Sequence, residues 1–331
     1  MKCKKILAIL LVVAMMGMMA ACGGASGSSS SVASEAPSSA AESASTKAAD
    51  STTTSGDDVT IGLLVYNDKN EFIQKLISGA QEKCDEFGYK LVTYSADKDS
   101  AKEITNMEDV ISLSPDVILY NPVDSDAAEA TIALANAANI PVITVDRVAN
   151  GGEVISHVAS DNVYGGELAG NYMVELLGSE GGQVVEIQGQ AGTSAMRERG
   201  EGFNNIIAQH SEIQVVVTQI GNWDKAQGMA IMENALQAYP DIKAVFAHND
   251  TMALGAMEAA QAAGKNDIKI IGFDADDDAV IAVKEGTMAA TIEQLPTLMG
   301  SRGVELANMY LNKETVPEAE AVEVALLKTE K

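Results

Sequence analysis

Short apolar runs rich in β-branched residues alternate with longer amphipathic segments from residue 59 almost to the end of the chain. This alternation is typical of βα units around a parallel sheet. A single core stops growing at about 250–300 residues, and residues 57–331 reach that size, so two doubly wound α/β lobes are predicted. The predicted strands are Thr60–Tyr66, Lys90–Tyr94, Val117–Tyr120, Val142–Val145, Val154–Val158, Val184–Ile187, Val215–Ile220, Ala244–Ala247, Ile268–Phe273 and Ala289–Ile292. Predicted helices between them include Glu71–Phe87, Ala127–Ala138, Met196–His210 and Thr251–Ala263.

Polar residues recur after the predicted strands at matching intervals. Intervals of 51 and 25 residues separate Asn70, Asn121 and Asp146, and intervals of 50 and 25 residues separate Arg199, Asn249 and Asp274. Each half of the chain thus places hydrogen-bonding groups beyond the carboxyl ends of its strands, where open α/β sheets bind ligands. Two lobes whose strand ends face each other would form a binding cleft between them.

The candidate ligand-binding residues combine carboxylates, guanidinium groups and amides with aromatic faces. They are Asn70, Phe72, Asn121, Asp146, Arg147, Arg199, Trp223, Asn249, Asp274 and Gln294. This mixture suits a small polyhydroxylated ligand, because each hydroxyl group both donates and accepts, and the C–H face of a ring packs on an aromatic side chain. Structural roles are the alternative: Asp146 and Asp274 as helix caps or loop residues, Trp223 as a hydrophobic staple, and Arg147 and Arg199 as partners of nearby acids.

No catalytic constellation is visible in the sequence. It lacks a nucleophile elbow, a phosphate-binding glycine loop and a His-Glu-x-x-His zinc motif. Cys84 is the single cysteine of the predicted folded part, and we interpret it as a packed small hydrophobe. No enzyme activity, metal or cofactor is therefore expected. The formal charge of −25 argues against a nucleic-acid partner.

The N-terminal segment indicates the compartment. Three lysines precede an uncharged apolar run over residues 6–21, which is too short for a membrane-spanning helix and typical of a secretory signal over residues 1–21. The residues before Cys22 resemble the lipobox of bacterial lipoproteins, so Cys22 is predicted to be a lipid anchor in the cell membrane. Residues 22–56 are rich in Ser, Ala, Gly and Thr and are predicted to be a disordered tether.

Several longer stretches of the chain carry a family resemblance. They are Asn121–Ala127, Ile140–Arg147, Ala191–Gly200, Asn249–Ala256, Gly272–Asp274 and Ala290–Pro296. On these residues the chain resembles the bacterial extracytoplasmic sugar-binding proteins of the type I fold, and among them the ribose binders, over essentially all of residues 58–329. The resemblance implies that the sugar contacts fall on Asn70, Phe72, Asn121, Asp146, Arg147, Arg199, Asn249, Asp274 and Gln294. Trp223 occupies a position that is aromatic in the family.

The first βα loop departs from the family pattern. Tyr66 stands where ribose binders carry a small hydroxyl residue, and Ile73 replaces the second of two aromatic residues. Glu71 replaces a proline. These changes leave the polar core of the expected pocket intact and alter its wall, so Tyr66 and Ile73 are predicted to influence specificity.

The resemblance also implies how the two lobes are joined and used. Three crossings near Ser160, Pro296 and Val322 would give a first lobe of 58–160 with 295–322 and a second of 161–294 with 323–331. A sugar would close the cleft by hinge motion, and an ABC import permease would recognise the closed form. The expected function is capture of ribose or a close monosaccharide by a monomeric, lipid-anchored protein.

Two other functions are compatible with the same fold. A sugar sensor would present its closed form to a membrane receptor or kinase instead of a permease. An extracellular enzyme acting on sugars would use Asp146 and Asp274 as a carboxylate pair. Arg147 and Arg199 are expected to hold both acids ionised, which argues against a proton donor. A repressor of this fold is excluded, because a signal and a tether replace the DNA-binding helices.

Overall fold

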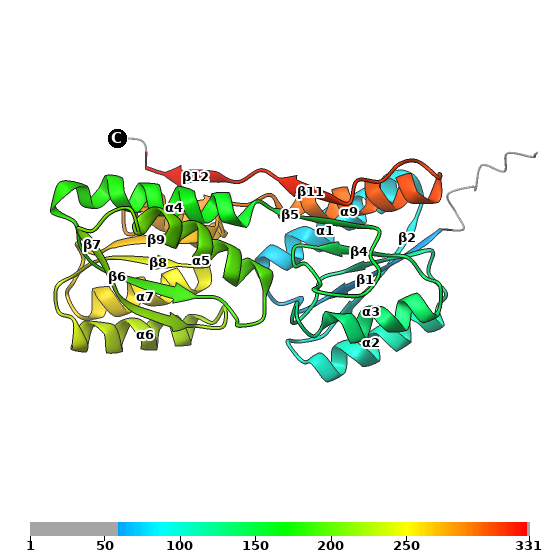
Figure 1. Cartoon of the computed structure of the whole chain (residues 1–331), viewed down its shortest axis with the longest axis horizontal. Helices are drawn as coiled ribbons and strands as arrows, with labels where there is room; N and C mark the ends of the chain where they lie inside the picture. Colours follow the sequence, from blue (N-terminus) through cyan, green and yellow to red (C-terminus); the bar gives the residue numbers. More distant parts are fainter. Residues whose placement is uncertain (1–58, 330–331) are drawn as a thin grey trace, which may run out of the picture. The chain divides into compact units, whose positions relative to one another are not determined.

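The structure is a computed structural model that describes residues 59–329. The predicted signal, the Cys22 anchor and the predicted tether lie outside the described residues. The described residues form two six-stranded sheets with flanking helices (Figure 1). The predicted α/β fold with two doubly wound lobes is confirmed.

The first lobe contains the first sheet and the helices that pack on it. Its elements are β1 (Thr60–Val65), α1 (Glu71–Phe87), β2 (Lys90–Ser95), α2 (Ser100–Ser112), β3 (Val117–Tyr120), α3 (Ala128–Ala137), β4 (Val142–Val145), β5 (Ser156–Ser160), α9 (Pro296–Leu311) and β11 (Ala319–Val322). The strand order is β11-β5-β4-β3-β1-β2, and all neighbouring strands are parallel. The order reverses between β1 and β3, which is where open α/β sheets bind ligands.

The second lobe repeats this arrangement. Its elements are α4 (Asn162–Leu177), the 3-10 helix η2 (Gly178–Glu180), β6 (Gly182–Gln188), α5 (Ser194–Ile207), β7 (Ile213–Ile220), α6 (Lys225–Ala238), β8 (Ile242–Ala247), α7 (Asp250–Ala262), β9 (Lys269–Asp274), α8 (Asp277–Glu285), β10 (Ala290–Glu293) and β12 (Ala325–Lys328). The order β12-β10-β9-β8-β6-β7 matches the first sheet strand for strand. Only the edge strand differs in direction, since β12 is antiparallel to β10.

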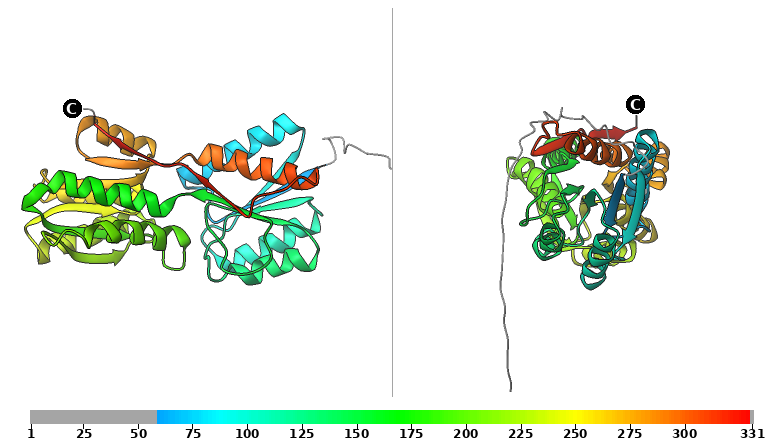
Figure 2. Two further views of the ribbon diagram at one scale, coloured as in Figure 1. Left: turned by 45° about the horizontal axis from the view of Figure 1, so that its top comes forward. Right: turned by 90° about the vertical axis from the view of Figure 1, so that its right-hand side faces the viewer.

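Helices cover both faces of each sheet (Figure 2). In the first lobe, α1 packs with α9 on one face, and α2 packs with α3 on the other. Strand β3 serves both cores, with Leu119 facing α1 and α9 and Ile118 facing α2 and α3. Burial on both faces explains why this strand is a continuous apolar run. Cys84 on α1 is fully buried, as predicted, and burial raises the pKa of its thiol to about 12.

The chain passes between the two sheets three times. It does so after β5, after β10 and between β11 and β12, and Figure 1 shows the last of these passages in red. Strands β11 and β12 are absent from the sequence prediction. Strand β5 begins at Ser156, two residues later than Val154, the predicted start. The remaining strands and the four named helices form close to their predicted positions.

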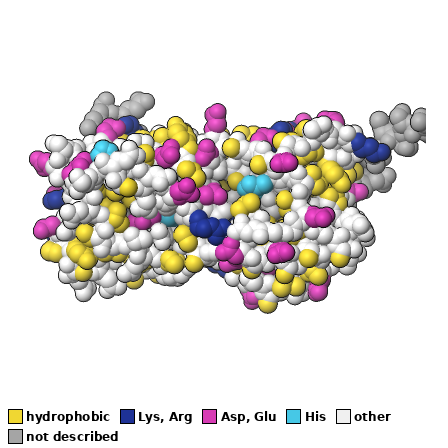
Figure 3. Space-filling model, in the orientation of Figure 1, with side chains coloured by type: hydrophobic (Ala, Val, Ile, Leu, Met, Phe, Trp, Pro, Cys, Tyr) yellow, Lys and Arg dark blue, Asp and Glu magenta, His cyan; other side chains and the backbone are white. Residues whose placement is uncertain are grey.

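The surface fits the acidic composition of the chain. Figure 3 shows acidic side chains scattered over the visible face among apolar and uncharged ones. Within residues 59–329, no helix combines the length and the apolar character needed to span a membrane.

Candidate ligand-binding site

A cavity lies between the two lobes, at the carboxyl ends of the strands of both sheets. Its lining residues are Tyr66, Asn70, Phe72, Asp146, Arg147, Ala195, Arg199, Trp223, Asn249, Asp274 and Gln294. All predicted ligand residues except Asn121 are among them, and so is Tyr66 of the predicted specificity wall.

Arg147 is the centre of the first lobe's side of the cavity. Its Nη1 donates to the carbonyl oxygens of Pro122 and Val123, at 3.1 Å each. Its guanidinium group lies 3.7 Å from the centre of the Tyr66 ring, and its Nε lies 3.7 Å from Oδ2 of Asp146. The strand-end carbonyls and the aromatic ring therefore fix the direction of the guanidinium group.

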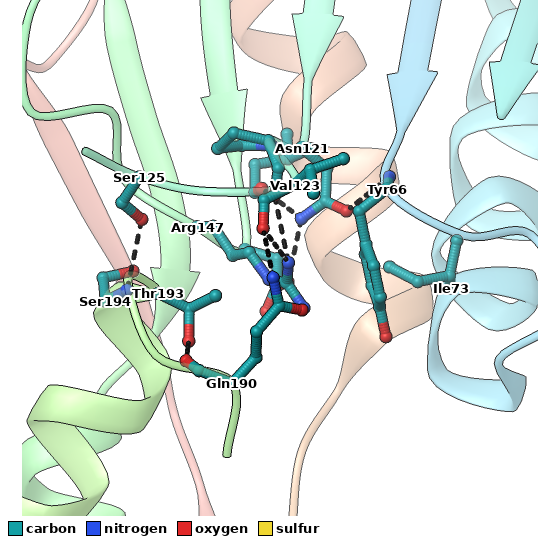
Figure 4. A network of polar contacts seen from close by, with 12 residues as sticks. Tyr66, Ile73, Asn121, Val123, Ser125, Arg147, Gln190, Thr193 and Ser194 are labelled. Atoms are coloured by element: carbon teal, nitrogen blue, oxygen red, sulfur yellow. Dashed lines mark hydrogen bonds and ion pairs between the residues drawn. The ribbon is translucent and has the colours of Figure 1, made fainter. Parts of the chain in front are cut away.

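Asn121 does not line the cavity, and Figure 4 shows it beside Tyr66. The residue is fully buried, and its Nδ2 donates to Oδ2 of Asp146 at 2.9 Å and to the carbonyl of Val145 at 3.1 Å. Its Oδ1 accepts from the backbone N–H of Tyr66 at 3.3 Å. Asn121 therefore positions Asp146 and Tyr66, which do line the cavity.

Arg199 is the centre of the second lobe's side. Its Nε donates to Oδ1 of Asn162 at 2.9 Å, and its Nη1 donates to the carbonyl of His248 at 2.6 Å. Oδ1 of Asp274 lies 3.4 Å from Nη1, and the Phe273 ring centre lies 3.7 Å from the guanidinium group. This environment closely resembles that of Arg147.

Neither Asp146 nor Asp274 is the residue that precedes a helix, so neither acts as a helix cap. Asp274 accepts from Nε2 of Gln294 at 2.6 Å, and the residue that precedes α8 is Asp276. Burial raises the pKa of both Asp146 and Asp274, although Arg147 and Arg199 act in the opposite direction. The pKa of each acid is therefore shifted in the direction opposite to the one expected from the neighbouring arginine alone, because desolvation has the larger effect.

Asn70 and Asn249 combine two roles. Each is the N-cap residue of a helix, where Oδ1 of Asn70 accepts from the N–H of Ile73 at 3.2 Å and Oδ1 of Asn249 accepts from Met252 at 3.0 Å. Both residues also line the cavity, so the caps orient their remaining amide groups. Ile73 is fully buried in the first lobe's core and does not line the cavity, unlike the neighbouring Phe72.

Trp223 is buried against the second lobe and lines the cavity. The fourth position of the following helix α6 is Gly228, which has no side chain, so Trp223 cannot form the hydrophobic staple considered above. The far edge of its indole ring lies on Gly189, where an added Cβ would come within 1.8 Å of Cη2. Gly189 therefore makes room for the ring at this wall.

Two buried glutamates near the arginines were not predicted. Oε1 of Glu103 on α2 accepts from the N–H of Val123 at 2.6 Å, and Oε1 of Glu186 on β6 lies 3.0 Å from Nε2 of His248. Both carboxylates are at least 97% buried. Glu186 interrupts the apolar run of β6, and such a charge in a central strand was the available sequence signal.

The chemistry of the cavity is that of binding. It offers carboxylate and amide acceptors, guanidinium donors and aromatic faces, and burial raises the pKa of Tyr66 to about 12, so its hydroxyl group keeps its proton. Among residues 59–329, no group of three His, Cys, Asp or Glu side chains is arranged to hold a metal ion. Two lobes around a polar cavity with these groups define a two-lobe binding protein for a small polar ligand.

Comparison with known proteins agrees with this class. The family model described as a periplasmic binding protein domain matches residues 61–315, so the chain belongs to the periplasmic binding protein family. It is 47% identical to the ribose import binding protein RbsB of Escherichia coli (strain K12) over 268 residues, which cover 81% of this chain and 90% of that protein. It is 44% identical to RbsB of Bacillus subtilis (strain 168), over 78% of this chain and 84% of that protein.

Solved structures show the same fold. An ABC transporter solute binding protein from Bacillus halodurans C-125 with bound myo-inositol has a TM-score of 0.78 and 31% identity. The match covers 84% of this chain and 96% of that one. The relatives are binding components of importers, and this chain is likewise a binding protein and not an enzyme.

Proposed function

We propose that the protein captures D-ribose or a closely related monosaccharide outside the cytoplasm and delivers it to the permease of an ABC importer. The observation that carries this proposal is the cavity with an aspartate–arginine pair from each lobe. The identity of 44–47% to proteins named for ribose import supports the choice of sugar.

Two carboxyl groups and two guanidinium groups account for recognition of the hydroxyl groups of the sugar. Asp146 and Asp274 accept from hydroxyl groups, while Arg147 and Arg199 donate to hydroxyl oxygens. The aromatic residues Phe72 and Trp223 line the same cavity and pack on the C–H face of the sugar ring. A sugar in this cavity would form hydrogen bonds with polar side chains that the protein buries.

Binding is coupled to closure of the lobes in this proposal. The moving bodies are residues 58–160 with 295–322 and residues 161–294 with 323–331. Asp146 belongs to the first body and Asp274 to the second, so only a closed arrangement lets one small sugar contact both. The sugar therefore shifts the population toward the closed form, which the permease recognises.

We also propose that Cys22 carries a lipid that holds the protein at the cell membrane. The support is the apolar signal followed by small residues and Cys22 in the sequence. Replacing Cys22 by Ala should move the protein from the membrane fraction to the soluble fraction of cells. Retention of the variant in the membrane fraction contradicts the anchor without affecting the sugar proposal.

Thermal melting with a sugar panel tests the main proposal. Purified protein is melted with D-ribose, D-allose, L-arabinose and D-galactose, and Asp146→Ala serves as the non-binding control. A ligand at 100 times its dissociation constant stabilises the folded state by about 2.7 kcal/mol, which gives a clear shift in Tm. A shift with D-ribose that is absent in the control supports the proposal. No shift with any monosaccharide contradicts it.

A further inference from the structure

A polar contact joins the two lobes beside the cavity. It is formed by two segments that contain none of the predicted ligand residues. Residues 123–126, which follow β3, lie against residues 190–194, which lead into α5 (Figure 4). The N–H of Ser125 donates to the carbonyl of Gly192 at 3.0 Å, and the N–H of Ser194 donates to Oγ of Ser125 at 3.1 Å. We call these two segments the polar latch.

The polar latch is closely fitted. Ser125 is fully buried and Ser194 is 2% exposed, so these hydroxyl groups are removed from water. Gly192 has a φ of +87°, and an added Cβ would lie 2.0 Å from Oδ2 of Asp124 in the other lobe. Glycine is thus required both for its backbone conformation and for the close approach of the lobes.

The polar latch also reaches the groups that hold Arg147. The carbonyl of Val123 accepts from Nη1 of Arg147 at 3.1 Å and from Nε2 of Gln190 in the second lobe at 3.2 Å. The N–H of Val148, next to Arg147, donates to Oγ of Ser194 at 3.2 Å. The position of Arg147 and the approach of the second lobe therefore depend on the same atoms.

Elsewhere the lobes meet through weaker contacts. Lys75 on α1 lies 3.2 Å from Oδ1 of Asp277 on α8, but their side chains are 38% and 83% exposed. Asp126, the last residue of the first latch segment, lies 3.5 Å from Arg197 on α5, and both side chains are exposed. Exposed ion pairs of this kind contribute little, so the buried bonds of the latch dominate the polar contact between the lobes.

We propose that the polar latch adds to sugar affinity without touching the sugar, and that Ser125, Ser194 and Gln190 are positioning residues for Arg147. The latch bonds connect bodies that are otherwise joined by the three passages of the chain, so they form when the lobes close. Apparent affinity scales with the population of the binding-competent form. This inference rests on the proposed function. It adds residues that determine how much of the protein is in the closed form.

The test compares the double variant Ser125→Ala/Ser194→Ala with wild type. Two neutral hydrogen bonds are lost, so the dissociation constant for D-ribose should rise about tenfold, through faster dissociation. The ratio of affinities for D-ribose and a second sugar should stay unchanged, because the latch does not contact the ligand. Ser301→Ala is the matched control, since Oγ of Ser301 donates to Gly79 at 3.0 Å within the first lobe.

Two further measurements keep the test decisive. Gln190→Ala, at a partly buried position, should raise the dissociation constant several-fold even if the double variant folds poorly. Dyes on α2 and α6 should report fewer molecules with closed lobes in the double variant, with and without sugar. Unchanged dissociation rates together with an unchanged closed population would contradict the proposed role of the polar latch. If wild type binds no monosaccharide, the proposed function fails, and the closed population of the sugar-free proteins still decides the role of the latch.

Discussion

The two arginine centres of the cavity reach the same environment from different elements. Arg147 follows β4, whereas Arg199 belongs to α5, yet each guanidinium group lies 3.7 Å from the centre of an aromatic ring. The rings are Tyr66 for the first and Phe273 for the second. Each arginine also donates to backbone carbonyl groups that follow the third strand of its own lobe, two for Arg147 and one for Arg199. The two lobes therefore repeat the surroundings of the guanidinium group more closely than they repeat the position of the arginine in the sequence.

A buried glutamate supports each centre, and here the lobes differ. Glu103 accepts one backbone N–H, from Val123, and burial raises its pKa to about 7. Burial also acts to raise the pKa of Glu186, but hydrogen bonds from His248, Gln188 and Asn204 outweigh it, and this pKa is lowered. A buried carboxyl group is thus held as an anion where several donors surround it, as at Glu186, and keeps its proton more readily where there are fewer, as at Glu103.

The largest expected effect on sugar affinity comes from removing the aspartate beside either arginine. Asp146→Ala and Asp274→Ala should each weaken sugar binding at least a hundredfold, because removing one partner leaves the other polar groups of the pair buried and unpaired. Isothermal titration with D-ribose measures the loss. Both variants should remain folded, since their carboxyl groups are costly to bury.

Equal losses in the two variants would support use of both lobes in binding. Near-native affinity in one variant would show that the sugar depends on a single lobe. Circular dichroism of each variant separates lost binding from lost folding.

Glu103→Gln is expected to stabilise the protein at alkaline pH. The pKa of Glu103 is about 7 in the folded state and 4.5 in the reference state, so wild type binds the extra proton only when folded. Stability is therefore lost as pH rises from about 4.5 to 7, by up to about 3 kcal/mol. Urea unfolding should show the variant more stable than wild type at pH 8 and similar at pH 4.5. A variant less stable than wild type at pH 8 contradicts this account.

Glu186→Gln should have the opposite sign. The lowered pKa means that the ionised carboxylate stabilises the folded state above about pH 4.5, and this contribution disappears as pH falls through the folded pKa. A neutral amide cannot accept from all the donors around it, so a loss of about 2 kcal/mol at pH 7 is expected in the same urea experiment. Equal signs for Glu103→Gln and Glu186→Gln would remove the distinction between the two lobes.

The smallest effects should come from the ring beneath Arg147. Tyr66→Leu removes the stacked ring and should raise the dissociation constant for D-ribose about tenfold. Tyr66→Phe keeps the ring and removes the hydroxyl group, so a change of only a few-fold is expected. Titration calorimetry of both variants separates stacking from hydrogen bonding. A larger loss for Tyr66→Phe than for Tyr66→Leu would assign the role of Tyr66 to its hydroxyl group.

The sequence was informative where local chemistry decides structure. Strand β4 is a β-branched run buried on both faces, and its position was predicted to the residue. Strands β11 and β12 are short, contain alanine and are only partly buried. They pair at sheet edges with strands distant in the chain, so no local pattern marked them. Tertiary pairing created these strands.

The sequence allowed most of the residue types at the site to be predicted, but not the directions of their side chains. The spacing of polar residues after strands indicated five of the eleven lining residues, but it could not show that Asn121 turns toward Asp146 instead of the cavity. Ala195 has no functional group that could have drawn notice, although it lines the cavity. The directions of loop side chains follow from tertiary contacts, which the order of residues does not reveal.

A crystal structure of the protein grown with D-ribose would show which residues of the two lobes hold the sugar. We expect one sugar between the lobes, with hydroxyl groups within hydrogen-bonding distance of both Asp146 and Asp274 and its ring packed on Phe72 or Trp223. A sugar bound to residues of one lobe only, or bound outside this cavity, would contradict this expectation.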